Sequence, residues 1–198
     1  MEIIKQDNKD VDKVVTALEN EAVLVLATDT VYGLVCDATS EKATRKILKI
    51  KNRDELKTLL IFVDSIDQAE KFALMSEEHK EFLKKNWPGA VTVILNARNI
   101  KDAKKRLSVL VYKNGTIGMR NPSYGFLNLV LKKFGRPLAQ TSANISGQPS
   151  TNKIAEIMGQ FGGQTIQPDI VVNAGDLSNS KPSSIIDLTK NKIKILRK

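Results

Sequence analysis

Short, continuous apolar runs alternate with helical patterns along this chain, and the alternation constrains the fold more than any other feature. The run Ala22–Ala27 contains no polar residue, which is typical of a strand buried on both faces. Val11–Leu18 before it has helical spacing. Ser40 after it can cap a helix whose residues Ala43 and Ile47 share one face. Helices and strands therefore interleave, which predicts an α/β fold.

The rest of the chain repeats this pattern. Further strands are predicted at Leu59–Val63, Val91–Leu95, Pro137–Gln140, Ile170–Val172, Ser184–Asp187 and Ile193–Leu196. Further helices are predicted after the capping residues Ser65 and Ser76 and at about Phe126–Phe134 and Ile154–Phe161. Neither a repeat nor a linker interrupts them, so we expect one domain over residues 1–198.

A hairpin is predicted where two strand-like segments, Leu107–Tyr112 and Thr116–Met119, flank the dipeptide Asn114-Gly115. Hairpins require antiparallel pairing, whereas the interleaved helices favour parallel pairs. We therefore expect a twisted, open, mixed sheet with helices packed on it, rather than a purely parallel one.

Composition narrows the function. With 41% hydrophobic residues and no run approaching the roughly 20 that a membrane span needs, the chain is expected to have no membrane partner. The first residues, Met1–Asp7, lack the layout of a secretory signal. Cys36 is the only cysteine, so an intramolecular disulfide is excluded and a cytoplasmic location is expected. One cysteine and one histidine, His79, also exclude the usual His/Cys metal cages, although Mg²⁺ accompanying a nucleotide stays open.

The formal net charge of +9 favours an anionic partner such as a nucleotide, RNA or an acidic protein. One group of cations stands directly before the predicted strand Leu59–Val63: Lys51, Arg53 and Lys57, which we call the basic cluster. Ammonium and guanidinium groups together suit phosphate oxygens. A solvated helix end is the alternative, because basic residues are favoured in a last helical turn.

Two polar loops follow predicted strands. Thr28–Leu34 offers hydroxyls and a carboxylate where open α/β sheets tend to bind ligands. Thr141–Gly147 combines small side chains with hydroxyl and amide donors that suit phosphate. The chain has neither a Walker phosphate loop nor a G-x-G-x-x-G dinucleotide motif.

In combination, these segments resemble the YrdC family of threonylcarbamoyl-AMP synthases from about Asn8 to Arg197. The matching strings occur in the family's order: Thr28–Leu34, the basic cluster, Trp87–Thr92, Ile117–Pro122, Ser142–Gly147 and Pro182–Asp187. The resemblance implies a mixed α/β sheet curled around a basic cavity. It also implies a nucleotidyltransferase that converts L-threonine, bicarbonate and ATP into threonylcarbamoyl-AMP and pyrophosphate. ATP would be a substrate, and no bound prosthetic group is implied. The resemblance implies that this product passes to a threonylcarbamoyl transferase complex, which forms N6-threonylcarbamoyladenosine (t6A) in tRNA.

The resemblance also assigns roles to residues. The basic cluster, Lys51, Arg53 and Lys57, would hold the ATP phosphates and act catalytically by positioning and charge stabilisation. Further ATP contacts are expected from Thr116, Asn144, Arg197 and the segment Ser150–Asn152, with Asn152 taken as its representative. L-Threonine would be held by Thr30, Arg120, Ser142 and Ser183, with Arg120 on the carboxylate.

Three positions depart from the family pattern: Thr58 replaces a frequent proline, and Phe62 and Tyr124 replace histidines. Two other functions stay open. The same fold could be an RNA-binding module in ribosome maturation without catalysis, or an enzyme that transfers carbamoyl groups from another donor. Aromatic residues make up only 5% of the chain, which disfavours base stacking, and direct contact with tRNA is left open.

Overall fold

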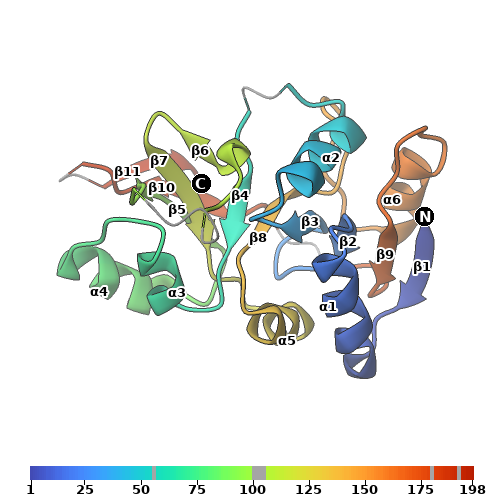
Figure 1. The fold of residues 1–198 in the computed structure, drawn as a ribbon, viewed down its shortest axis with the longest axis horizontal. Coiled ribbons are helices and arrows are strands. Elements are labelled where there is room, and N and C mark those ends of the chain that lie inside the picture. Colours follow the sequence, from blue (N-terminus) through green and yellow to red (C-terminus); the bar gives the residue numbers. More distant parts are fainter. Residues whose placement is uncertain (55–56, 100–105, 179–180, 191–192) are drawn as a thin grey trace.

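A mixed sheet crosses the molecule and carries helices on both faces (Figure 1). It is seen in a computed structural model that describes residues 1–54, 57–99, 106–178, 181–190 and 193–198. Within these residues the strand order is β1-β9-β2-β3-β8-β4-β7-β5-β10-β11, and β6 pairs with β7 beside that path. The strands are β1 (Glu2–Lys5), β2 (Leu24–Leu26), β3 (Gly33–Asp37), β4 (Leu60–Phe62), β5 (Val91–Asn96), β6 (Tyr112–Lys113), β7 (Thr116–Arg120), β8 (Leu138–Ser142), β9 (Ile170–Asn173), β10 (Ser184–Asp187) and β11 (Lys194–Arg197).

Parallel and antiparallel pairs are combined in this sheet, which confirms the predicted mixed α/β class. The β1–β9, β2–β9, β4–β7 and β5–β10 pairs are parallel. The β2–β3, β3–β8, β4–β8, β5–β7, β6–β7 and β10–β11 pairs are antiparallel. The predicted hairpin forms at β6–β7, where Asn114 and Gly115 both adopt positive φ.

The helices begin and end close to the predicted positions. They are α1 (Val11–Glu19), α2 (Glu41–Lys51), α3 (Ile66–Glu70), α4 (Glu77–Asn86), α5 (Gly125–Phe134) and α6 (Ile154–Gly162), with 3-10 turns η1 (Asn8–Asp10) and η3 (Val109–Val111). The capping prediction is confirmed: the hydroxyls of Ser40, Ser65 and Ser76 each accept a hydrogen bond from the backbone N–H three residues later. No helix in the described ranges is long and apolar enough to cross a membrane.

Strand β2 is buried on both faces, as its unbroken apolar run predicts. Val23 and Val25 belong to one core cluster, whereas Leu24 and Leu26 belong to the other. Successive strand residues point to opposite faces, so a strand between two cores needs an apolar residue at every position. The sheet therefore separates two hydrophobic cores.

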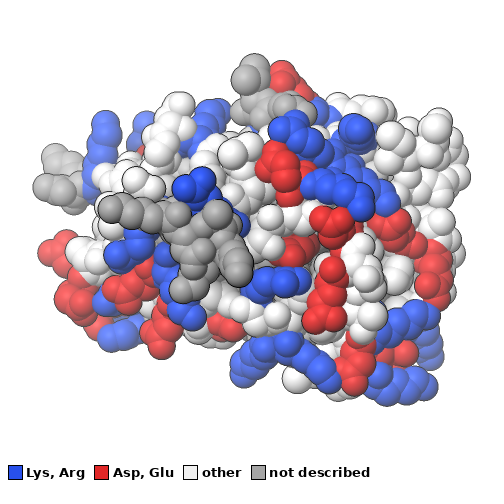
Figure 2. Space-filling view, in the orientation of Figure 1, with Lys and Arg blue, Asp and Glu red and all other residues white. Residues whose placement is uncertain are grey.

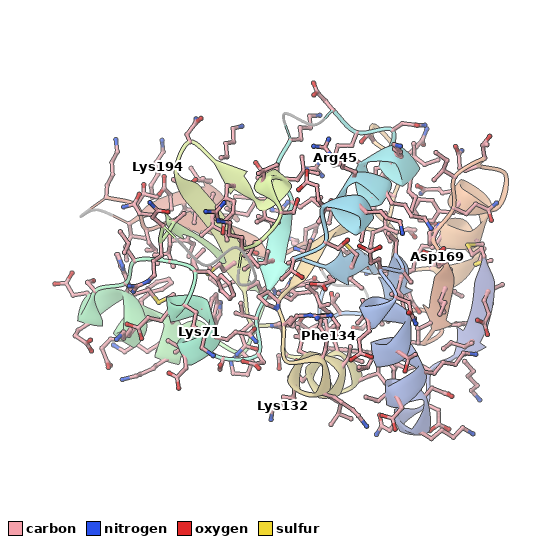
Figure 3. All side chains as sticks on the ribbon, in the orientation of Figure 1. Arg45, Lys71, Lys132, Phe134, Asp169 and Lys194 are labelled. Atoms are coloured by element: carbon pink, nitrogen blue, oxygen red, sulfur yellow. The ribbon has the colours of Figure 1, made fainter. Side chains whose placement is uncertain are left out.

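Helices α1 and α5 cover one face of the sheet together, in the lower part of Figure 1. The side-chain view in Figure 3 shows Phe134 between α5 and the sheet and Lys132 on the outer side of the helix. On the surface seen in Figure 2, basic and acidic side chains are intermingled rather than gathered into one basic stripe. The charge on this face therefore does not single out a nucleic-acid track.

Two local predictions were wrong. Leu107–Tyr112 was expected to be a strand, but Val109–Val111 forms the 3-10 turn η3 and only Tyr112 joins the sheet. The Ser108 hydroxyl donates to Glu41 of α2 at 2.6 Å and accepts from Thr44 at 2.8 Å. These hydrogen bonds hold the segment against α2 instead of in the sheet. Gly33 and Leu34 were assigned to a polar loop, but they open β3 and are fully buried there.

Candidate active site

The two polar loops are adjacent because their strands pair. Strand β3 runs antiparallel to β8, with Gly33 opposite Ser142. Just beyond this pair, the Ala143 amide donates to the Tyr32 carbonyl at 2.8 Å. Loops at the ends of paired strands share one edge of the sheet, and here that edge lies beside a cavity of about 290 Å³.

The cavity is lined by three guanidinium groups, several hydroxyls and a few apolar side chains. The described lining consists of Thr28, Thr30, Val31, Tyr32, Gly33, Arg53, Thr58, Leu60, Phe62, Arg120, Gln140, Thr141, Ser142, Ser150, Pro182, Ser183, Ile185 and Arg197. This set contains no carboxylate. Such a cavity suits an anion, because cations and hydroxyl donors line it and no carboxylate belongs to the described lining.

Arg120 is held rigidly at one end of the cavity. It is 3% exposed, and Nε donates to the Gly89 carbonyl at 2.9 Å. Nη1 donates to Thr30 Oγ1 at 3.0 Å, and Nη2 donates to Asp29 Oδ1 at 2.5 Å. A guanidinium has five N–H groups, so these bonds leave one donor on each terminal nitrogen. Guanidinium N–H groups that remain available can donate to a carboxylate.

The Thr28–Thr30 turn supports Arg120. The Thr28 hydroxyl donates to the Val31 carbonyl at 2.7 Å and accepts from the Thr30 amide at 3.0 Å. The same hydroxyl lies 3.0 Å from that of Thr30, which contacts Arg120. Asp29, the carboxylate of the first polar loop, forms the ion pair with Arg120. The two residues are 91 positions apart, so local sequence gave no signal for the pair.

Arg53 reaches the cavity from the segment after α2. Its Nη1 donates to the Thr141 hydroxyl at 2.9 Å and its Nη2 to the Thr58 carbonyl at 3.0 Å. Nε lies 3.2 Å from the Lys57 carbonyl. Burial lowers the pKa of Arg53 from its usual value, although a guanidinium stays charged at neutral pH. Arg53 therefore brings a fixed positive charge to the second polar loop.

Lys51 belongs to the predicted cluster but does not line the cavity. Its side chain is buried, and Nζ donates to oxygens of Ser142 and Asn144. Burial first, and the charge of Arg53 second, lower the pKa of Lys51 to about 7. Lys57 is exposed and lies outside the described lining.

Ser183 and Arg197 close the cavity from the last strands. The Ser183 hydroxyl lies 2.8 Å from the hydroxyl of Thr92, a fully buried residue of β5. Arg197 Nε donates to the Ser183 carbonyl at 2.9 Å. Burial and, second, the nearby charge of Arg120 lower the pKa of Arg197. Segments that are far apart in sequence thus meet at one cavity.

The other predicted contacts are more distant in this structure. Thr116 donates its hydroxyl to the Lys113 carbonyl at 2.7 Å, and Asn152 donates to the Ser178 carbonyl at 3.0 Å. Neither residue belongs to the described lining, nor does Asn144. From the segment Ser150–Asn152, Ser150 is the residue that lines the cavity. The ATP contacts assigned to Thr116, Asn144 and Asn152 therefore stay predictions.

Sequence reasoning did not single out several lining residues. Thr141 was placed in the second polar loop and Gln140 in the preceding strand, but neither was given a ligand role; both belong to β8 and line the cavity. Phe62, one of the departures from the family pattern, lines the cavity with its ring centroid 5.9 Å from the Arg120 guanidinium carbon. Tyr124 does not belong to the described lining, and its hydroxyl accepts a hydrogen bond from Gln6 Nε2 at 3.1 Å.

Tyr32 lines the cavity but has a structural contact of its own. Its hydroxyl donates to the Gly175 carbonyl at 2.6 Å and accepts from the Ala174 amide at 3.0 Å. Burial raises the pKa of Tyr32, so the phenol stays protonated at neutral pH. These bonds join the first polar loop to the end of β9.

A resident metal ion finds few ligands in this cavity. Among the described residues, no three His, Cys, Asp or Glu side chains gather as a metal would require. Because Mg²⁺ prefers carboxylate and other oxygen ligands, the hydroxyls and guanidiniums of the lining do not fit a protein-held Mg²⁺.

The fold is a mixed α/β sheet, and its cavity is lined by cations and hydroxyls that suit an anion. The family described as "Telomere recombination" (Sua5_yciO_yrdC) matches residues 16–198, and the chain belongs to this family. It is 30% identical over 190 residues to the "Threonylcarbamoyl-AMP synthase" of Pseudoalteromonas translucida, covering 94% of this chain and 97% of the relative. It is 34% identical to the "Putative threonylcarbamoyl-AMP synthase" of Methanocaldococcus jannaschii, covering 90% and 80%.

Solved structures show the same fold. "Crystal structure of P. abyssi Sua5 complexed with L-threonine" has a TM-score of 0.86 and 26% identity, covering 99% of this chain and 56% of that one. The present chain therefore spans a little more than half of that protein. "Crystal structure of E. coli YciO" has a TM-score of 0.83 at 24% identity and covers 100% and 93%, which shows the fold alone.

Proposed function

We propose that this protein synthesises threonylcarbamoyl-AMP from L-threonine, bicarbonate and ATP and releases pyrophosphate. The observation that carries the proposal is the cavity, in which Arg120, Arg53 and Arg197 surround one space with hydroxyls between them. A reaction among a carboxylate-bearing amino acid, a carbamate and a polyphosphate brings several negative charges together. It needs such a concentration of fixed cations.

L-Threonine is assigned to the Arg120 end. The spare N–H donors on the two terminal nitrogens of Arg120 can receive the α-carboxylate, because Asp29, Thr30 and Gly89 already fix the plane of the guanidinium. The hydroxyls of Ser142 and Ser183 line the same cavity and can bond the amine or the side-chain hydroxyl. The complex of the P. abyssi relative with L-threonine supports threonine as the amino acid, whereas its place at the Arg120 end rests on the contacts above.

ATP is assigned to the Arg53 end. Arg53 and Arg197 bring permanent charges for phosphate oxygens, and Ser150 adds a hydroxyl. Thr116, Asn144, Asn152 and Lys57 stay proposed contacts around this end. Any Mg²⁺ would arrive with the nucleotide.

The chemistry requires no side-chain nucleophile. The threonine amine, after losing a proton, takes up CO₂ derived from bicarbonate and forms a carbamate. A carbamate oxygen then attacks the α-phosphorus as the bond to the bridging oxygen of pyrophosphate breaks. The side chains contribute by holding the reactants in line and neutralising the charge that develops.

The product, a mixed anhydride, would serve a transferase that modifies tRNA. The alternative of an RNA-binding module without catalysis is less well supported. The relatives of this chain are named as synthases, and basic and acidic side chains are intermingled on the face in Figure 2.

Pyrophosphate release tests the proposal. Wild-type protein with ATP should release pyrophosphate when both threonine and bicarbonate are present, and threonylcarbamoyl-AMP should appear in equal amount by mass spectrometry. Release that ignores threonine would contradict the synthase assignment. No release together with tight RNA binding would favour the RNA-binding module.

A further inference from the structure

Lys51 is a buried cation that the proposed chemistry does not use directly. It is the last residue of α2, and Asn52 after it turns the chain through a left-handed conformation with φ 49°. Its side chain is 2% exposed and does not line the described cavity. Burying an ammonium is costly, so its contacts must compensate.

The ammonium is surrounded by oxygens of one loop. Nζ donates to the Ser142 carbonyl at 2.6 Å, to the Asn144 carbonyl at 2.6 Å and to Asn144 Oδ1 at 3.1 Å. An ammonium has three N–H donors, and these three acceptors use all of them. A phosphate oxygen could gain a bond from Lys51 only by displacing one of these contacts.

The backbone of Lys51 holds the same loop. Its carbonyl accepts from the Ser146 amide at 2.8 Å. Asn144 completes the arrangement, since its Oδ1 also accepts from the Ser142 hydroxyl at 2.6 Å. Its Nδ2 donates to the carbonyls of Ile145 at 3.0 Å and Gln148 at 2.7 Å. The loop from Ser142 to Gln148 is therefore folded around Lys51.

This loop forms part of the cavity wall. Ser142 lines the cavity, and Thr141 before it binds Arg53. A change in the loop would move a hydroxyl assigned to threonine and the partner of an arginine assigned to ATP. Lys51 can therefore influence both substrates without contacting either.

We propose that Lys51 is a positioning residue, whose side-chain nitrogen fixes the Ser142–Gln148 loop in its binding shape and does not contact the ATP phosphates. The proposal rests on the proposed function for the identity of the ligands. It changes the role predicted for Lys51 from phosphate contact to loop support.

Hydrogen exchange in the ligand-free protein tests this role. Below pH 7, where Lys51 is protonated, Lys51→Met should raise the exchange of the 142–148 amides at least about tenfold, because three bonds to a charged donor are lost. Lys49→Met is the matched control: Lys49 is exposed in the same last turn of α2, so its exchange should equal that of wild type. If Lys51 were instead a phosphate contact, Lys51→Met would leave the exchange of the 142–148 amides unchanged until nucleotide is added.

Calorimetric binding separates the two roles further. With Lys51→Met, affinities for AMP, ATP and L-threonine should fall by similar factors. A contact to the outer phosphates would instead weaken ATP alone. Lys51→Arg should not restore binding, because a planar guanidinium cannot replace a tetrahedral ammonium among three oxygens. If Lys51 contacted the phosphates, Lys51→Arg would restore ATP binding.

Unchanged loop exchange in Lys51→Met, or rescue by Lys51→Arg, would overturn the proposal. If Lys51→Met does not fold, Lys51→Gln keeps two N–H donors without the charge, and faster exchange confined to residues 142–148 is expected. The exchange measurement needs no ligand. It therefore stays decisive if wild-type protein fails to release pyrophosphate, which would count against the proposed function alone.

Discussion

Arg120 and Lys51 are both buried cations near one cavity, but their surroundings differ. Arg120 is fixed on one side by Gly89, Asp29 and Thr30 and keeps a donor on each terminal nitrogen. Lys51 directs every donor to the Ser142–Asn144 loop. Burial alone therefore does not identify a ligand-binding cation. What distinguishes the two is whether internal contacts leave donors available.

The largest effect is expected from Arg120→Ala. Removing the carboxylate contact should lower kcat/KM for threonine by roughly 30- to 1000-fold, about 2–4 kcal/mol. Arg120→Lys should not recover it, because an ammonium cannot match the three fixed acceptors and still form a fork. Steady-state pyrophosphate release measures both variants, with melting curves as the folding control. Wild-type kcat/KM in a folded Arg120→Ala protein would remove Arg120 from the threonine site.

Arg53→Ala should rank next. Losing one charge-assisted contact should raise the KM for ATP by roughly 10- to 100-fold, while the KM for threonine changes little. Varying each substrate at saturation of the other separates the two constants. An equal loss for both substrates would mean that Arg53, like Lys51, acts through the loop that contains Thr141.

The free energy of unfolding should depend on pH because Lys51 has different pKa values in the folded and unfolded states. Its pKa is about 7 in the folded protein and about 10.4 in the unfolded chain. Below pH 7 both states are protonated, so this residue adds no slope. Between about pH 7 and 10 only the unfolded state binds the proton, so unfolding free energy should rise with pH, by at most about 1.4 kcal/mol per unit.

Urea denaturation at pH 7, 8 and 9 measures this slope. Lys51→Met should lack it, and Lys49→Met, in the same turn, should retain it. Identical slopes in wild type and Lys51→Met would show that Lys51 keeps its proton throughout this range.

The smallest effect is expected from Lys57→Ala. Lys57 is exposed, so its loss should change the KM for ATP by only about threefold, and less at high salt. Measurements at two ionic strengths check this. A salt-independent loss as large as that of Arg53→Ala would place Lys57 among the direct phosphate contacts.

Local chemistry explains why much of the fold could be predicted. Apolar runs such as Ala22–Ala27 and caps such as Ser40 depend on near neighbours in sequence. The segment Leu107–Tyr112 could not be predicted in the same way, because distant residues of α2 hold Ser108.

The site was predictable in part. Arg53, Arg120 and Ser183, which the motifs singled out, line the cavity, and their substrate contacts stay predictions. The direction of the Lys51 side chain could not be predicted, because the left-handed turn at Asn52 separates it from Arg53. Its partners on the Ser142 loop lie 91 to 93 positions away. The pairing of Asp29 with Arg120 is equally distant in sequence.

The pairing of β10 with β11 has a consequence for protein synthesis. Arg197 enters the cavity from β11, whereas Thr28 and Thr30 lie far earlier in the chain and are therefore synthesised first. Chains fold from the amino-terminal end as they are made. A nascent chain that already contains Arg120 with its partners Asp29 and Thr30 still lacks one wall of the cavity. Catalytic competence should therefore arise only after β11 has been synthesised and has paired with β10.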